Sequence, residues 1–156
     1  MKIRTFAFLL LFIIISCDGT LGGFDSRNFV TPKQNIEKAV DTLFAKNPEL
    51  KIPEKWKEYD NWKKSGYDFL DTRIFYFQSE PEEMYYVSFV EDGNEKQNEN
   101  GPTILAIRSI FTKSHNKWLK DEDFEIGEKE RIEKRFDTEV VSKLEKYTGV
   151  KATREN

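Results

Sequence analysis

The sequence predicts an α+β domain in which a four-stranded antiparallel meander is packed by an N-terminal and a C-terminal helix. Two apolar stripes with helical spacing, one after residue 31 and one over residues 128–147, indicate the helices. Between them, residues 73–121 hold runs of aromatic and β-branched residues that are separated by short polar links. A chain of 156 residues with 14% aromatic residues is long and apolar enough for one domain with a real core.

The first helix is predicted to begin near Thr31, which suits the N-cap position. Pro32 fits the first helical position, and Gln34 completes a capping box. Asn47-Pro48 is expected to end the helix. The apolar stripe is formed by residues three and four apart: Ile36, Ala39, Val40, Leu43 and Phe44.

Residues 53–64, "PEKWKEYDNWKK", predict a short second helix. Trp56, Tyr59 and Trp62 would share one face of it, because they recur at steps of three. Ser65-Gly66 is the expected end.

Four strands are predicted over residues 73–78, 84–90, 103–113 and 117–121. The short links favour antiparallel neighbours, although the element order alone also allows a cystatin-like arrangement. One sheet face is expected to be buried through the alternating residues Phe75, Phe77, Tyr85, Val87 and Phe89. The opposite face carries Tyr76, Met84 and Tyr86, so it needs a cover or forms a surface for a partner.

The C-terminal helix is the clearest element of the chain. Ile132, Phe136, Val140 and Leu144 recur at every fourth residue and form its apolar stripe. Lysines in the last turn complement the helix dipole, and Gly149 is the expected stop.

The N-terminal residues carry a separate signal. Lys2 and Arg4 precede a ten-residue apolar run over residues 6–15, and the small residue Ser16 follows. A charged start, a short apolar middle and a small residue at the cleavage point are typical of a secretory signal. The run has about half of the ~20 residues that a stable transmembrane helix needs.

The motif Ile14-Ile15-Ser16-Cys17 resembles the lipobox of bacterial lipoproteins. The resemblance implies transfer of lipid to the Cys17 thiol, cleavage after Ser16, and a domain held outside the cytoplasm on the cell membrane or outer membrane. We therefore expect a signal peptide over residues 1–16, a lipidated cysteine with a flexible tether over residues 17–28, and the globular domain over residues 29–156. The alternative is an ordinary secretory signal in which the single cysteine occurs by chance.

Charge and motifs narrow the function. The 25 basic and 28 acidic residues argue against a nucleic-acid binder, which needs a basic face. The only histidine, His115, falls in a predicted turn, where a solvated role is expected. Asp121, Asp123 and Glu125 alternate as calcium ligands do, but the glycine and the twelfth residue do not fit an EF-hand, which leaves an irregular calcium site as the alternative. We expect no metal and no cofactor.

We expect a non-enzymatic, lipid-anchored domain that binds a protein, and an immunity or inhibitor lipoprotein is one version. The acidic loop over residues 91–100 would suit a basic partner. The alternatives are a cell-wall or carbohydrate-binding or hydrolytic domain, which would use the tryptophans with an acidic pair such as Glu82-Glu83 or Glu91-Asp92, and a structural envelope lipoprotein. The residues expected to bind the partner are Trp56, Tyr59, Trp62, Tyr76, Tyr86, Glu91 and Asp92.

Overall fold

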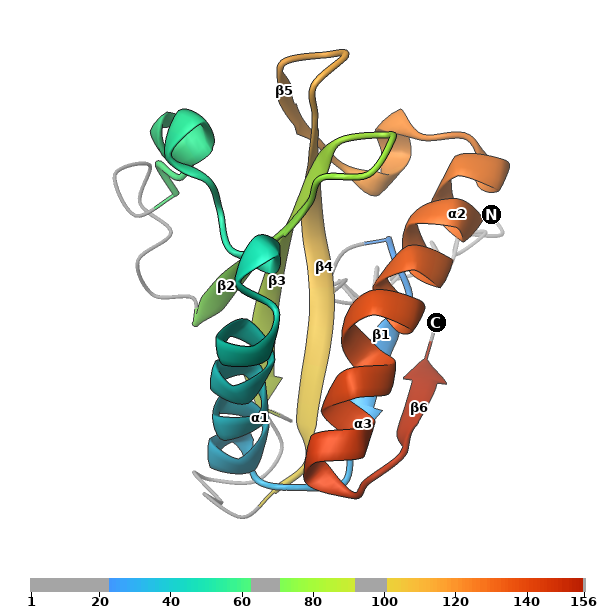
Figure 1. Ribbon diagram of the computed structural model, residues 1–156. Helices are drawn as coiled ribbons and strands as arrows, with labels where there is room; N and C mark the ends of the chain where they lie inside the picture. The colour runs from blue at the N-terminus through green and yellow to red at the C-terminus, as the bar shows by residue number, and fades with distance from the viewer. Residues whose placement is uncertain (1–22, 63–70, 92–100, 156) are drawn as a thin grey trace, which may run out of the picture.

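The computed structural model describes residues 23–62, 71–91 and 101–155 (Figure 1). An antiparallel sheet with helices on one face confirms the α+β class. The four predicted strands are present, and each is antiparallel to the next. They are β2 (Thr72–Phe77), β3 (Glu83–Glu91), β4 (Thr103–Thr112) and β5 (Lys117–Leu119).

Two further strands correct the prediction of a four-stranded sheet. β1 (Ser26–Phe29) and β6 (Ala152–Glu155) extend it in the order β2-β3-β4-β1-β6. β3 occupies one edge of β4, while β1 and β5 share the other edge at its two ends. Each added strand has only four residues and no apolar alternation, so the pattern that reveals strands in a sequence is missing from both.

β1 also moves the predicted boundary between tether and domain. Residues 24–28 belong to the fold, because Phe24 is only 2% exposed and its ring lies 6.1 Å from the Phe124 ring. The placement of this segment depends on backbone pairing with β4 and β6, which no local pattern announces. Residues 17–22 lie outside the described part of the chain, so the rest of the tether stays a prediction.

Helix α1 (Lys33–Lys46) ends before Asn47 as predicted, and its buried residues are Ile36, Ala39, Val40 and Leu43. The predicted capping box at Thr31 is wrong, because Pro32 is the N-cap and no side chain caps the helix. Thr31 instead lies in a tight turn, where its backbone N–H donates to the Phe29 carbonyl oxygen over 2.7 Å. The Thr31 hydroxyl accepts a 3.0 Å hydrogen bond from the Asn35 side chain.

The C-terminal helix consists of α2 (Ile126–Phe136), a π-helical turn (Asp137–Val141) and α3 (Ser142–Thr148). Gly149 ends it with a φ of 72°, in the left-handed region that glycine adopts without strain. The π turn explains the strict spacing of four. In a regular α-helix of about 3.6 residues per turn, residues four apart drift around the axis, and the extra residue of an i→i+5 turn offsets that drift. All four stripe residues are therefore buried: Ile132, Phe136, Val140 and Leu144.

The main core lies between the sheet and the helices. α1 and the α2–α3 run lie side by side across one sheet face (Figure 1). The alternating face predicted from the sequence is confirmed here, since Phe75, Phe77, Tyr85, Val87 and Phe89 all belong to this core.

The second predicted helix takes another form. It is the 3₁₀ helix η2 (Glu54–Tyr59), and two shorter 3₁₀ turns are η1 (Pro48–Leu50) and η3 (Asp121–Asp123). Steps of three match the 3₁₀ period of three residues per turn, so Trp56 and Tyr59 do share one side. The predicted end at Ser65-Gly66 lies outside the described residues.

Candidate functional site

The second sheet face carries an aromatic cluster built from segments far apart in the sequence. It contains all three tryptophans of the chain. Trp62 stacks on Tyr86 with ring centroids 4.1 Å apart, and Trp62 and Trp118 meet edge to face at 5.2 Å. Tyr59 lies 4.4 Å from Phe111. We call the set formed by Trp56, Tyr59, Trp62, Tyr86, Phe111 and Trp118 the aromatic cluster.

The cluster covers the sheet residues whose exposure the sequence left open. Tyr76, Met84 and Tyr86 are 5%, 1% and 2% exposed, so this face is covered rather than open. Tyr76 and Tyr86 were expected to bind a partner, and this expectation is corrected because both lie inside. Burial depends on the segment that crosses the sheet, which strand alternation cannot predict.

The outer members of the cluster keep part of their surface. Trp56, Tyr59 and Trp62 are half-buried, as is Trp118, which sequence reasoning did not select. The sequence did place Trp118 in a predicted strand next to the His115 turn, and that position could have indicated a partly exposed tryptophan. The acidic part of the expected surface is not decided: Glu91 ends β3, and Asp92 lies outside the described residues.

Glu82 holds η2 against the sheet edge. Its Oε1 accepts hydrogen bonds from the Lys55 ammonium at 2.7 Å and from the Tyr76 hydroxyl at 2.5 Å. The Trp56 indole N–H donates to the same oxygen over 3.1 Å, and Lys113 lies 3.3 Å from Oε2. The Lys55 and Tyr76 hydrogen bonds lower the pKa of Glu82 to about 2. Glu82 is thus an ionised structural acceptor that connects two segments.

Glu83 points to the opposite face and contacts the helix layer. Its side chain is 1% exposed and pairs with Arg131 at 2.5 Å and with Arg135 at 2.8 Å. The Tyr85 hydroxyl donates to Glu83 over 3.0 Å. Burial raises the pKa of Tyr85, and the neighbouring Glu83 carboxylate adds to that effect. This ion-pair network connects α2 to the start of β3.

Glu82 and Glu83 are therefore neighbours in sequence but not in space. Their partners lie on opposite sheet faces, η2 for Glu82 and α2 for Glu83. A glycosidase pair needs two carboxyls facing one substrate, and this pair cannot provide that geometry. The period of two in a strand was the sequence signal for this division.

The remaining candidates from the sequence occupy exposed turns. His115 is exposed in the β4–β5 turn, where its Nδ1 lies 2.9 Å from the Thr112 hydroxyl. Asp121 and Asp123 form η3, and Glu125 is the N-cap residue of α2. Within residues 23–62, 71–91 and 101–155, no group of three or more His, Cys, Asp or Glu side chains is arranged to hold a metal ion.

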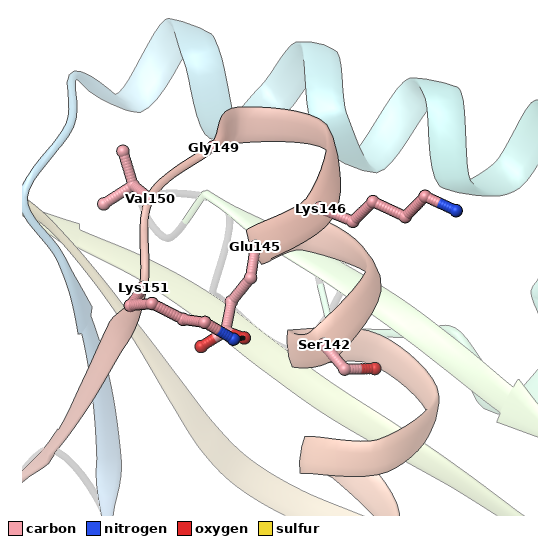
Figure 2. A pocket seen from close by; sticks show the side chains of 6 residues that line it. All are labelled: Ser142, Glu145, Lys146, Gly149, Val150 and Lys151. Carbon is pink, nitrogen blue, oxygen red and sulfur yellow. Dashed lines mark hydrogen bonds and ion pairs between the residues drawn. The ribbon is translucent and has the colours of Figure 1, made fainter.

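A hollow of about 260 Å³ lies where α3 turns into β6 (Figure 2). Glu145 accepts hydrogen bonds from the Lys151 ammonium at 2.6 Å and from the Ala152 backbone N–H at 3.0 Å. In Figure 2 the Lys151 amine meets the Glu145 carboxylate, while Lys146 points away. The Glu145 carboxylate joins the helix to the strand through these hydrogen bonds, so we give it a structural role and do not include the hollow in the candidate site.

None of the helices among the described residues is long and apolar enough to cross a membrane. Comparison with known proteins finds no matching family model, no similar curated protein and no similar solved structure.

Proposed function

We propose that the protein is a lipid-anchored component of the bacterial cell envelope whose domain binds a protein partner through the outer surface of the aromatic cluster. The observation that carries the proposal is the gathering of Trp56, Trp62 and Trp118 at one half-buried surface. Tryptophan and tyrosine dominate the binding energy of protein interfaces, where they combine large apolar area with a polar group. In this chain η2, the residues that follow it up to Trp62, and β5 present them from outside the main core.

The attachment part of the proposal rests on the lipobox. Two or three acyl chains on Cys17 would hold the protein durably, because each buried CH₂ contributes about 0.8 kcal/mol. Cys17→Ser should abolish palmitate labelling and move the protein from the membrane to the soluble fraction. A variant that stays membrane-bound with unchanged labelling would refute the attachment.

The binding part is tested by photo-crosslinking in intact cells. A crosslinking amino acid at the exposed Lys120, two residues beyond Trp118 in extended backbone, lies on the same face as Trp118. The same amino acid at the exposed Lys134 lies on the helix layer as a matched control. We expect one discrete product from position 120 and none from position 134. Equal products from both positions, or none from either, would contradict the proposal.

Trp118→Ala provides the energetic test. The side chain donates a 3.0 Å hydrogen bond to the Tyr59 carbonyl oxygen and packs on Phe111. We expect at least a tenfold loss of the product from position 120, since truncating a central interface tryptophan costs more than about 2 kcal/mol. If the partner is a toxin, as in the immunity version, expression of the wild-type protein should also protect cells and the variant should not.

A further inference from the structure

Arg108 differs from the other arginines that the structure describes. The other five each form an ion pair with a carboxylate. Within residues 23–62, 71–91 and 101–155, Arg108 forms no ion pair with a carboxylate. Its Nε–H donates a hydrogen bond to the Ser88 hydroxyl, 2.7 Å away. Ser88 is fully buried and Arg108 is half-buried. No carboxylate among the described residues therefore accepts a hydrogen bond from the two Nη groups of the guanidinium, which are the groups that form bidentate pairs with carboxylates.

A β-bulge places this side chain. Tyr86 pairs with Ser109 and Val87 pairs with Ile107, so Arg108 is the extra residue of β4. Ile107 and Ile110 both point into the helix-side core, which turns the residues between them to the other face. Without the bulge, a strand with a period of two could not keep both isoleucines on the same side.

The surroundings of Arg108 are costly for a cation. Its neighbours across the sheet are Tyr86, on which Trp62 stacks, and the Ser88 hydroxyl. Desolvation lowers the pKa of the guanidinium. A neutral residue at this position would avoid that cost, whereas a guanidinium here can form two parallel hydrogen bonds to an incoming carboxylate.

We propose that Arg108 is an anion-binding residue that receives a carboxylate of the protein partner, beside the Trp62–Tyr86 stack. The inference rests on the proposed function for the source of the carboxylate. The site itself rests only on the β-bulge, the partial burial of Arg108 and the bidentate hydrogen-bonding geometry of its guanidinium. It adds a charged, orienting contact to an otherwise aromatic surface, and buried charge-assisted hydrogen bonds confer specificity at interfaces.

Small anions test the site without a partner. The Nε–H signal of Arg108 is followed by NMR in the protein at constant ionic strength, while sodium acetate or sodium phosphate replaces chloride. We expect a saturable shift with acetate at Arg108 and none at Arg27, which is already paired with Asp137. The signal is assigned to Arg108 by its absence from R108Q, and no saturable shift in the wild type would overturn the proposal. Phosphate binding at least tenfold tighter than acetate would overturn the assignment to a carboxylate.

Asp68, outside the described residues, is the acidic residue between Trp62 and Asp71. If acetate shifts the Arg108 signal only in the Asp68→Asn variant, Arg108 binds the Asp68 carboxylate of its own chain and the proposal is wrong. R108Q removes the hydrogen bond to Ser88 but no ion pair, so its urea midpoint should stay close to that of the wild type. If the midpoint falls, R108K replaces R108Q in the crosslinking experiment, where a partial loss of product is expected.

Crosslinking separates this inference from the proposed function. R108Q should lower the product from position 120 at least tenfold, with R108K intermediate, because a lysine cannot form the bidentate pair. A product that R108Q leaves unchanged overturns the role of Arg108 while the binding function stands. An Arg108-dependent acetate shift without any crosslinked partner supports the site and refutes the proposed function.

Discussion

The π turn in the C-terminal helix makes a deletion informative. Deleting the exposed Thr138 removes one residue from the π turn (Asp137–Val141) and changes the stripe spacing from four-four-four to four-three-four. At about 100° per residue, eleven residues turn through about 1100°, within about 20° of three full turns. The original twelve residues would overshoot three turns by about 120° in a regular α-helix. A regular helix should therefore replace the π turn with the same residues buried.

The expected cost is small. The Thr138 hydroxyl donates to the Lys134 carbonyl oxygen over 2.8 Å, and the Ser142 hydroxyl donates to the Thr138 carbonyl oxygen over 2.6 Å. Both are exposed hydrogen bonds within the helix. We expect the free energy of unfolding to change by no more than about 1 kcal/mol, as for other exposed sites. At a urea m-value of about 2 kcal/mol per M, the urea midpoint should move by less than about 0.5 M.

Deletion of Lys134 is the matched control. Lys134 is also exposed, but it precedes Phe136, which is 1% exposed, and Arg135, which pairs with Glu83. Shifting these residues by one position should cost about 3–5 kcal/mol for the aromatic ring alone, and so lower the urea midpoint by about 2 M or prevent folding. Tryptophan fluorescence reports both unfolding curves. Equal losses from the two deletions, or an unfolded Thr138 deletion, would refute the explanation.

Three further predictions concern single substitutions. Glu83→Gln should lower the free energy of unfolding by about 3 kcal/mol in urea denaturation, because it removes the buried charge that pairs with Arg131 and Arg135; a change below about 1 kcal/mol would show that the network is neutral. The folded-state pKa of Glu82, about 2, is lower than the 4.5 of an unperturbed glutamate, so its stabilising effect is complete above about pH 4.5 and disappears as the pH falls toward 2. The stability difference between wild type and Glu82→Gln should shrink over that window, and a constant difference would argue against the Lys55 hydrogen bond as its cause. Gly149→Ala should cost about 1–2 kcal/mol in thermal unfolding because of its positive φ, whereas Gly127→Ala, in open space in α2, should be neutral or stabilising.

The elements that were predicted correctly are those that a local pattern encodes. The stripe at Ile36 to Leu43 and the alternation at Phe75 and Phe77 record directly which side of an element faces the core. The same local view placed a capping box at Thr31, since a pattern of residue types cannot show that the backbone there is already in a turn.

The candidate site was predicted in part. Trp56, Tyr59 and Trp62 were expected to share one side, and they join one cluster. The addition of Trp118 from β5, and the burial of Tyr86 beneath Trp62, depend on how η2 crosses the sheet. Contacts between residues so far apart in the chain leave no periodic signal.

By itself, the sequence determined the N-terminal and C-terminal helices and four strands, because each depends on the order of residue types within one short segment. The lipid-anchored address is a prediction of the same kind. Only the tertiary structure decided that β1 and β6 complete the sheet, that Glu82 and Glu83 serve opposite layers, and that a bulge turns Arg108 toward the aromatic cluster. These features follow from pairing and burial between distant segments. Backbone hydrogen bonds and desolvation act through space, so their partners cannot be deduced from neighbours along the chain.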